Sequence, residues 1–594
     1  MSIFDVLSMI GGLALFLYGM HIMGEGLSKA SGGKLEKILE KLTSNPIKAV
    51  LLGAGVTAVI QSSSATTVMV VGFVNSGIMK LSQAVGIIMG ANIGTTATSW
   101  ILSLTGIESG NFFMKMLKPT SFSPILAIIG VVLIMFTKKE KKHNIGKILV
   151  GFAILMTGMS AMSSAVEPLA EVPEFTNILL MFSNPILGLL AGTVLTAVIQ
   201  SSSASVGILQ ALCATNSLTY ATALPIIMGQ NIGTCVTAMI SSVGASKNAK
   251  RAALVHLYFN MIGTLVFMAV FYIINAVVPF QFLNDNASAV GIAVIHSVFN
   301  IVATALLLPF GKVLEKLAYM TIREDETTDT AALDEFALLD ERFLDKPSLA
   351  LDHCRQVTNN MADLSRKCLF TSFEILAEYN QEKADYISQV EDRVDKYEDM
   401  LGTYLMKVSG RDLSEKDSED LSMLLHTIGN FERVADHACN LTEAAKEMLD
   451  KDLHFSEKAG TELKIFRNAL IEIVDTAFEA FKTQDTEKAK MVEPLEEVID
   501  DLNMELKARH VRRLTEGKCT IELGFVHSDI TTNFERVADH CSNIAVCLIQ
   551  VKQEGFDTHE YLDTIKRENN EQFRTNYGRF KEKYKLPASS KMVK

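Results

Sequence analysis

The strongest constraint on this sequence is an internal duplication within about its first 310 residues. Residues 44–67 align with residues 183–206 without a gap, at an offset of 139, and 15 of the 24 positions are identical. Each copy carries the run Gln-Ser-Ser-Ser inside an otherwise apolar stretch. The same offset relates MGANIGT at 89–95 to MGQNIGT at 228–234. Gene duplication explains this agreement, so we expect two copies of one fold in this part of the chain.

Charge and hydropathy divide the 594 residues into two regions. Residues 1–320 carry 18 basic and 11 acidic side chains, a formal charge of +7, whereas the remaining residues carry −19. A bilayer crossing needs about 20 apolar residues. We place crossings near 3–28, 81–105, 121–137, 147–167, 219–244, 252–279 and 286–310. The second region is too acidic for a nucleic-acid partner, and the eight cysteines show no paired spacing, which indicates reduced thiols.

The two Gln-Ser-Ser-Ser stretches are too polar for straight lipid-facing helices, so we interpret them as re-entrant hairpins that return to their starting face. Four basic segments then share one face, namely 29–48, 138–147, 247–251 and 312–316. That face is cytoplasmic by the positive-inside rule. The expected protein is a multi-pass protein of the cell membrane with its N-terminus outside and residues 311–594 in the cytoplasm. Lys115 and Lys118 are exceptions to the charge pattern.

Three full crossings separate equivalent points of the two copies. Because three is odd, we expect the second copy to be inverted and the two hairpins to enter from opposite faces. Inverted repeats with broken helices that meet near the middle of the membrane are typical of secondary transporters. The predicted fold class is therefore all-α: a polytopic membrane transporter with two inverted repeats containing re-entrant hairpins, followed by soluble helical bundles.

The residues at the predicted breaks suggest two kinds of ligand. Serine hydroxyls, free backbone N–H groups and a positive helix end suit an oxyanion. Amide and hydroxyl side-chain oxygens suit a hard monovalent cation. No Lys or Arg lies at predicted membrane depth, so co-bound cations or helix dipoles would neutralise the anion. The alternative is structural: these small residues cap the hairpin tips or allow close helix packing.

The doubled motif, QSSSATT and QSSSASV followed by GANIGTT and GQNIGTC, resembles the sodium/phosphate cotransporter family over roughly residues 1–310. The resemblance implies sodium-driven uptake of inorganic phosphate, with sodium as the coupling ion. It implies phosphate binding by Ser62, Ser63, Ser64, Ser201, Ser202 and Ser203. It implies sodium binding by Gln61, Thr66, Thr67, Asn92, Thr95, Gln200, Asn231 and Thr234. Ser205 and Val206 replace Thr66 and Thr67 in the second copy, so sodium sites need not be duplicated.

A second pattern repeats in the last two predicted crossings. His256-x-x-Phe-Asn260 recurs as His296-x-x-Phe-Asn300. Residues four apart share one helix face, so these side chains either bond between helices or line a cavity. We favour the interhelical hydrogen bond.

The acidic region contains its own duplication. NFERVADH at 430–437 recurs at 533–540, and an acidic pair precedes each copy. With apolar residues at helical spacing, this predicts two three-helix bundles and resembles the PhoU family over about residues 346–555. The resemblance implies binding of iron or another divalent or trivalent metal by Glu391, Asp395, Glu432, Asp436, Glu496, Asp500, Glu535 and Asp539. The alternative is a solvated acidic face.

The expected organisation has five parts. They are a first repeat (1–145), a second repeat with the final span (146–320), a linker (321–345), the PhoU-like unit (346–555) and a basic tail (556–594). Phosphate, sodium and the lipid bilayer are the expected partners, with a homo-oligomer or a signalling partner on the PhoU-like unit. The sequence shows no arrangement of a nucleophile with a general base, so we do not expect an enzyme. Two rival functions stay open: transport or passive conduction of another small oxyanion, and a phosphate-signalling membrane receptor.

Overall fold

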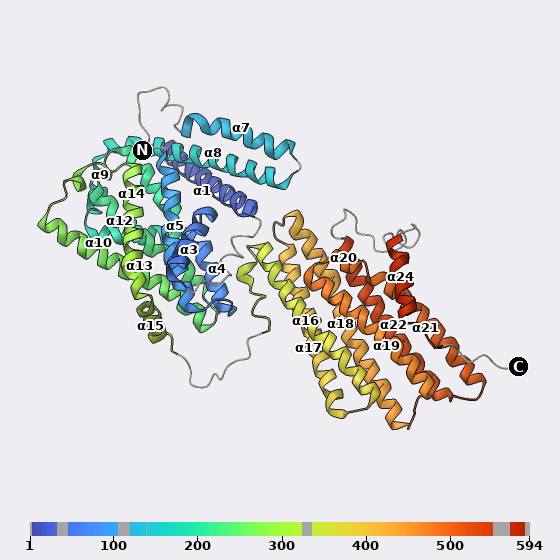
Figure 1. The fold of residues 1–594 in the computed structure, drawn as a ribbon. Coiled ribbons are helices and arrows are strands. Elements are labelled where there is room, and N and C mark those ends of the chain that lie inside the picture. The colour runs from blue at the N-terminus through green and yellow to red at the C-terminus, as the bar shows by residue number, and fades with distance from the viewer. Residues whose placement is uncertain are drawn as a thin grey trace. The chain divides into compact units, whose positions relative to one another are not determined.

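The computed structural model describes residues 3–31, 45–104, 119–137, 139–323, 335–550 and 571–587. Over these residues the chain is helical without a β-strand, as the sequence predicts, and it divides into the units Met1–Leu349 and Ala350–Lys594 (Figure 1). Several predictions lie outside the described residues: the loop with Lys115 and Lys118, most of the basic segment 29–48, residues 324–334 of the linker, residues 551–555 of the PhoU-like unit, and residues 556–570 and 588–594 of the tail.

The first unit contains the predicted crossings. Its helices are α1 (Ile3–Ser31), α3 (Pro46–Ile60), α4 (Ser63–Asn75), α5 (Leu81–Ser103), α7 (Pro119–Phe136), α8 (Glu140–Val166), α9 (Pro173–Met181), α10 (Pro185–Ile199), α11 (Ser202–Leu212), α12 (Tyr220–Ser241), α13 (Lys247–Val277), α14 (Ala289–Leu307) and α15 (Gly311–Thr321). Among the described residues, six helical stretches are long and apolar enough to span a membrane. The remaining predicted crossing, 121–137, coincides with α7, a shorter apolar helix.

Both predicted hairpins form as two short helices joined at the Gln-Ser break, α3 with α4 and α10 with α11. The local sequence explains where each hairpin begins. Asn45 and Asn184 accept hydrogen bonds from the first backbone N–H groups of α3 and α10, and a proline follows each as the first helical residue. Asparagine caps helix N-termini and proline fits the first turn. The repeated Ser-Asn-Pro therefore starts the same element twice.

Helix α5 runs antiparallel to α14. Near the C-terminal end of α5, the hydroxyl of Ser99 lies 2.7 Å from Nδ1 of His296, which is in the first half of α14. Nearer the N-terminal end of α5, the backbone oxygen of Met89 accepts from Thr304, close to the end of α14. Residue numbers on the two helices thus run in opposite senses.

Helix α12, the second-repeat equivalent of α5, runs parallel to α14. At their N-terminal ends the hydroxyls of Tyr220 and Ser288 lie 3.2 Å apart, and further along Asn231 donates to Asn300 at 3.2 Å. Because α12 is parallel and α5 antiparallel to the same helix, α5 and α12 oppose each other. The two repeats are therefore inverted, and the hairpins enter from opposite faces.

Glycines of the Gly-x-Asn-Ile-Gly motif allow each hairpin to press against the next helix. A Cβ at Gly90 would lie 2.0 Å from the backbone oxygen of Val50, and a Cβ at Gly229 would lie 2.0 Å from that of Leu189. The offset between the two contacts is 139 residues for both partners. The α3–α5 and α10–α12 pairs are thus packed alike, backbone against backbone.

Helices α1 and α8 form a reciprocal contact between the repeats. A Cβ at Gly19 would lie 2.3 Å from the backbone nitrogen of Leu155, and a Cβ at Gly158 would lie 2.3 Å from that of Phe16. Each residue of one contact is 139 positions from its counterpart in the other. A local pseudo-twofold axis therefore passes through this helix pair.

The second unit consists of two three-helix bundles, as the duplicated motif predicts. The first has α16 (Pro347–Ala377), α17 (Gln381–Ser409) and α18 (Glu415–Asp450), and the second has α19 (Glu457–Thr483), α21 (Val492–Thr515) and α22 (Ile521–Gln550), with the short α20 (Thr486–Ala489). Helices α18 and α22 join the bundles. The described part of the predicted tail forms α24 (Glu571–Lys583), which packs on α21.

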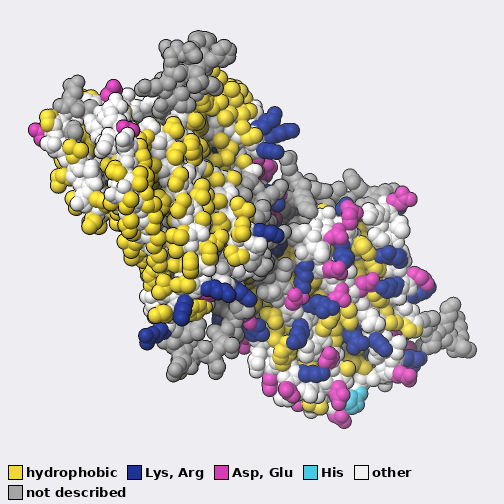
Figure 2. All heavy atoms as spheres, turned by 60° about the vertical axis from the view of Figure 1, so that its left-hand side comes forward, with side chains coloured by type: hydrophobic (Ala, Val, Ile, Leu, Met, Phe, Trp, Pro, Cys, Tyr) yellow, Lys and Arg dark blue, Asp and Glu magenta, His cyan; other side chains and the backbone are white. Residues whose placement is uncertain are grey.

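The surfaces of the two units differ. On the visible face of the first unit in Figure 2, apolar side chains form a broad field with few charges. Exposed apolar side chains of the first unit include Val194, Val198, Ile273 and Val277, each at least 60% exposed. On the second unit, both signs of charge are scattered over the surface. An exposed apolar belt of this size suits contact with lipid.

Candidate functional site

Each hairpin breaks at a glutamine in the left-handed backbone conformation. Gln61 has φ 60° and Gln200 has φ 57°. A side chain with a Cβ rarely adopts this conformation, and here the same residue adopts it at the same point of both repeats. The turn ends one helix and directs the next backbone N–H groups into the break.

Ser62 and Ser201 then cap the second helix of each hairpin. The hydroxyl oxygen of Ser62 accepts from the backbone N–H of Ala65 at 3.1 Å, and that of Ser201 accepts from Ala204 at 3.2 Å. The capping role that we kept as a structural alternative is thus real for the first serine of each motif. It also produces two equivalent helix N-termini, one in each repeat.

The remaining serines lie in the first turns of α4 and α11. Ser63, Ser202 and Ser203 are buried and Ser64 is half-buried. The first N–H groups of a helix have no acceptor within the helix, and they carry the positive end of its dipole. Each break therefore presents hydroxyl and backbone donors of the kind that bind oxyanions.

Helices α5 and α12 connect the two hairpins, because each packs against both α4 and α11. The hydroxyl of Thr98 on α5 donates to the side-chain oxygen of Gln61 at 2.9 Å. Gln210 of α11 donates to the backbone oxygen of the next residue, Ser99, at 3.1 Å. The tip of the first hairpin and the second helix of the other hairpin thus meet on adjacent residues of α5.

The predicted sodium ligands on α4, α5 and α12 are buried. Most donate a hydrogen bond to a backbone oxygen of their own helix, namely Thr66 to Ser62, Thr67 to Ser63, Asn92 to Ile88, Thr95 to Ala91 and Thr234 to Gln230. A threonine that donates its proton in this way keeps oxygen lone pairs for another partner. These predicted sodium ligands therefore lie on α4 of the first hairpin and on α5 and α12, which contact both hairpins.

The repeats differ in how they satisfy their buried hydroxyl groups. In the first, Thr57 donates to Thr66 at 3.0 Å. Their second-repeat equivalents, Thr196 and Ser205, are both completely buried, and neither hydroxyl has a hydrogen-bond partner among the described residues. Leaving a buried polar group unsatisfied costs about 1–3 kcal/mol.

The same difference recurs at the helix break. Gln61 is buried and bonded to Thr98, whereas Gln200 is exposed and the equivalent Thr237 has a buried hydroxyl without a partner in the described structure. Gln230 replaces an alanine of the first repeat; it is fully buried, and neither its side-chain nitrogen nor its oxygen is bonded within the described residues. The second repeat thus concentrates buried polar groups without a hydrogen-bond partner in the described structure.

Sequence reasoning missed these residues. Thr57, Thr98, Thr196, Ser205, Gln230 and Thr237 were not assigned to a site. The sequence does single out Gln230. The two Gly-x-Asn-Ile-Gly motifs differ at one position, where the first has Ala91 and the second has the polar Gln230. For the threonines, only the folded contacts show which hydroxyl is paired.

The His-x-x-Phe-Asn pattern bonds between helices, as we favoured. His296 pairs with Ser99, and Asn300 accepts from Asn231, so this copy joins α14 to α5 and α12. In the other copy, Asn260 donates to the sulfur of Cys235 at 3.4 Å. The motif therefore supports the helices around the breaks.

In the second bundle, three predicted metal ligands converge. Carboxylate oxygens of Glu496 and Asp500 on α21 and of Asp539 on α22 all lie within 4.8 Å of one another. The fourth predicted ligand, Glu535, is not a member of this group and accepts a hydrogen bond from Asn503 at 2.6 Å. Oxygen ligands from two helices at this separation fit a hard cation.

In the first bundle, the equivalent residues are electrostatically coupled. The pKa of Glu432 is raised to about 7 by burial and by the negative charge of Asp436, although Arg433 opposes the shift. Burial and Asp436 also raise the pKa of Glu391. Asp395 contributes to both shifts. Among the described residues, the predicted ligands that converge within 4.8 Å are Glu496, Asp500 and Asp539 of the second bundle, so the first bundle shows repulsion between its carboxylates without such a group.

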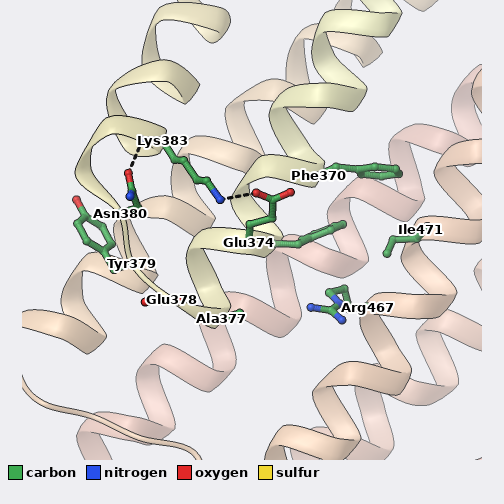
Figure 3. Close-up of a pocket in the computed structure, with 10 residues that line it drawn as sticks. Phe370, Glu374, Ala377, Glu378, Tyr379, Asn380, Lys383, Arg467 and Ile471 are labelled. Carbon is green, nitrogen blue, oxygen red and sulfur yellow. Dashed lines mark hydrogen bonds and ion pairs between the residues drawn. The ribbon is translucent and has the colours of Figure 1, made fainter.

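A separate pocket of about 680 Å³ lies on the second unit between α16, the start of α17 and α19 (Figure 3). Lys383 forms an ion pair with Glu374 at 2.6 Å across it, and Glu378 and Arg467 also line it. No sequence prediction falls on this pocket. Its lining acids and bases balance, so it shows no preference for an anion.

Inverted repeats with paired helix breaks, joined to two three-helix bundles, define a membrane transporter with an appended soluble unit. Residues 15–164 and 169–295 match the family described as Na+/Pi-cotransporter, and residues 358–445 and 464–548 match the PhoU domain. The chain therefore belongs to the Na+/Pi-cotransporter family and carries a PhoU domain, as the motifs indicate.

Relatives cover different parts of the chain. Salmonella typhimurium YjbB, named for inorganic phosphate export, is 25% identical over 566 residues, which is 94% of this chain and 99% of that protein. The sodium-dependent phosphate transport protein 2A of Rattus norvegicus is 38% identical over 99 residues, 16% of this chain and 15% of that one. The phosphate-specific transport system accessory protein PhoU homolog 1 of Thermotoga maritima is 24% identical over 215 residues, 35% of this chain and 91% of that protein.

Proposed function

We propose that the protein is a sodium-dependent symporter of inorganic phosphate whose PhoU domain regulates transport. The carrying observation is the pair of equivalent helix N-termini at Ser62 and Ser201, which enter from opposite faces. Phosphate would bind the serine hydroxyls and backbone N–H groups of both breaks, Ser62, Ser63 and Ser64 with Ser201, Ser202 and Ser203. In this proposal the two motifs are halves of one site.

Sodium would bind the amide and hydroxyl oxygens beside the serines. The proposed ligands are drawn from Gln61, Thr66, Thr67, Asn92, Thr95, Gln200, Asn231 and Thr234. We add Thr196, Ser205, Gln230 and Thr237, because the second repeat leaves their buried polar groups without hydrogen-bond partners in the described structure. A cation there would supply the missing interaction, and its charge would offset that of phosphate.

The direction of net flux follows from the ion gradients, because a symporter is reversible. An inward sodium gradient would drive phosphate uptake. Export, for which the Salmonella relative is named, would require an outward total driving force or a different coupling ion. We propose a cytoplasmic PhoU domain and an external N-terminus on the basis of the charged loops.

Transport of labelled phosphate by proteoliposomes tests the proposal. Purified protein should move phosphate when a sodium gradient is imposed, in the direction set by the gradient. Ser63→Ala and Ser202→Ala should each lower this flux by about tenfold or more, because each removes a donor to a charged ligand. Ser8→Ala, on an exposed part of α1, is the matched control.

The same assay separates the rival functions. Sulfate or arsenate carried in place of phosphate would indicate another oxyanion, and flux that ignores sodium would indicate a passive pathway. Absence of flux from protein that elutes as one monodisperse species would favour the phosphate-signalling receptor.

We further propose that each bundle binds a hard metal ion such as iron. Glu391, Asp395, Glu432 and Asp436 would hold one site, and Glu496, Asp500, Glu535 and Asp539 the other. When bound, the cation would neutralise the carboxylates and tie two helices of each bundle together.

A further inference from the structure

A short part of the predicted linker is built into the membrane unit. Residues 340–346, here called the linker clamp, contain the 3-10 turn Glu341–Phe343. The ring of Phe343 is fully buried, and its centroid lies 5.5 Å from that of Phe73 on α4. It also fills the space beside Gly72, where a Cβ would lie 2.8 Å from the Phe343 ring. The clamp therefore packs on the helix that begins at the first Gln-Ser-Ser-Ser motif.

Polar contacts extend the clamp from the first repeat to the second. Asn75, the last residue of α4, donates to Asp340 at 2.7 Å and accepts from the backbone N–H of Ser246, which caps α13. Arg342 donates to the backbone oxygen of Ser241, the last residue of α12, at 3.2 Å. The clamp thus joins α4 to the α12–α13 turn.

The clamp holds its own shape. Asp340 accepts from the backbone N–H of Arg342 at 2.9 Å and forms an ion pair with its guanidinium at 2.6 Å. The Asp340 side chain is only 6% exposed. The ion pair of Asp340 and Arg342 fixes the conformation of the clamp next to Phe343. The clamp is therefore a preformed docking element, because it loses little conformational entropy when it packs at the interface.

We propose that the linker clamp is an autoinhibitory contact that ties the two repeats together on this face and restrains the first phosphate-binding hairpin. Helix α4 has 13 residues, or about 20 Å, and begins at Ser63, while the clamp contacts its C-terminal end from Gly72 to Asn75. A rigid helix of that length transmits a displacement at one end to the other. The clamp also runs directly into α16, the first helix of the PhoU domain, which begins at Pro347. A change in that helix can therefore pull the clamp from its site.

This inference rests on the proposed function, since it assigns the regulation of the same site. To release a ligand by alternating access, the two repeats must separate on one face of the membrane unit. They cannot separate on the face that carries the clamp while the Phe343 ring and the hydrogen-bonded side chains of Asp340 and Arg342 bridge them. Removing the clamp should therefore increase exchange between the site and this face.

Two substitutions remove the contact from opposite sides. Phe343→Ala deletes the buried ring, and Gly72→Ala places a methyl group where the ring now lies. Both should raise phosphate flux in full-length protein at least about twofold, since opening of a gate limits turnover in many transporters and enzymes. The double variant should match either single variant, because both act on one contact. Gly55→Ala on α3 faces open space and is the matched control.

A labelling measurement separates failure of the clamp from failure of the proposed function. Ser64→Cys, in a background without the native cysteines, places a thiol near the first hairpin break. Maleimide is applied from the side of the membrane unit on which the clamp packs. It should label the Ser64→Cys thiol at least about twofold faster when Phe343→Ala is added. This readout needs no phosphate transport, so it decides the inference even if the protein moves no phosphate.

A crosslinking experiment tests the opposite change, in which the clamp is held in place. In the same background, Asn75→Cys with Asp340→Cys can be joined by a short, reducible crosslinker. Crosslinked protein with Ser64 intact should lose phosphate flux, and reduction should restore it. When Ser64→Cys is added, crosslinking should slow the labelling of the peptide that carries this thiol, and reduction should restore its labelling. Equal labelling in crosslinked and reduced protein, or unchanged labelling in Phe343→Ala and Gly72→Ala, would overturn the inference.

Discussion

At the scale of single residues, equivalent positions of the two repeats have different hydrogen-bond partners. Gln61 bonds to Thr98, whereas Gln200 is exposed and Thr237 has no hydrogen-bond partner in the described structure. Duplication therefore preserved the backbone of the break and not the bonding around it. Variants of the two threonines should separate a structural hydroxyl from one that serves a ligand.

Thr98→Val should destabilise the protein by about 1–3 kcal/mol, because it leaves the buried oxygen of Gln61 without its donor. Thr237→Val should change stability little and weaken the sodium dependence of phosphate flux, because the hydroxyl it removes has no hydrogen-bond partner in the described structure and is a proposed sodium ligand. Thermal unfolding in detergent and sodium titration of flux measure the two effects. Equal losses of stability in the two variants would contradict the assignment.

A histidine pair predicts how the stability of the PhoU domain depends on pH. His437 bonds to Asn533 and His540 to Asn430, and the two rings lie 5.5 Å apart. Burial, with the positive charges nearby, lowers the pKa of His540 to about 4. Between pH 6.5 and about 4 the unfolded chain therefore binds more protons than the folded one, and stability falls as pH falls.

The expected loss from pH 7 to pH 5 is on the order of 1 kcal/mol after allowance for partial exposure. Thermal unfolding of the full chain, followed by circular dichroism at both pH values, measures it. His540→Asn should reduce the pH dependence. His454→Asn, at an exposed histidine, should leave the dependence as it is. A His540→Asn variant with the native pH dependence would refute this account.

The role of a residue could be predicted from the sequence only where its position in the chain determines that role. The run at 61–64 and its copy at 200–203 predicted helix breaks with exposed donors because polar residues interrupt apolar helices there. Partners of Thr57 and Thr98 were not predictable, since a threonine on a buried helix bonds to its own backbone or to a neighbour according to tertiary packing. The linker clamp was missed because its region was assigned from charge, and one buried phenylalanine does not alter that composition.

At the scale of elements, the closest helix contacts depend on glycine. Gly90→Ala and Gly229→Ala should each destabilise the protein by several kcal/mol, because the added methyl group would lie 2.0 Å from a backbone oxygen that cannot move aside. Gly11→Ala, which faces open space on α1, is the control. Melting temperatures in one detergent compare all three. Similar melting temperatures for Gly90→Ala and Gly11→Ala would show that the helices separate without penalty.

Metal binding belongs to this scale too, because the ligands come from neighbouring helices. Iron or manganese at about 100 times its dissociation constant should stabilise the PhoU domain by about 2.7 kcal/mol. Asp500→Asn with Asp539→Asn should abolish the part of this effect due to the second bundle. Glu522→Gln on α22, outside the cluster, is the control. Calorimetric titration that detects no binding would favour the solvated acidic face.

The helices and hairpins were predicted well because the sequence patterns that indicate them extend over many residues. Helices of the PhoU domain have regular apolar spacing, and the hairpins are marked twice. The sense of insertion followed from an odd number of crossings, and hydrogen bonds from α14 to α5 and α12 confirm it. Helix α24 was not expected, because 571–583 is so rich in charge that only packing against α21 distinguishes it from a solvated tail.

At the scale of the whole molecule, truncation should separate the clamp from the bundles that follow it. A chain that ends at Leu349 keeps the clamp, and its phosphate flux should not exceed that of the full protein. A chain that ends at Thr321 lacks the clamp and should transport faster. Monodisperse elution of both chains is the control for folding. Two inert but well-folded truncations would make the PhoU domain integral to transport and favour the receptor function.

The reciprocal contact between α1 and α8 has an evolutionary consequence. Gly19 meets Leu155 as Gly158 meets Phe16, so the contact is unchanged when the repeats are exchanged. A single repeat could make the same contact with a second copy of itself inserted in the opposite orientation. The interface therefore preserves the geometry of a dual-topology homodimer. Within one chain the two halves are free to differ, and here Gln61 bonds to Thr98 whereas Gln200 is exposed.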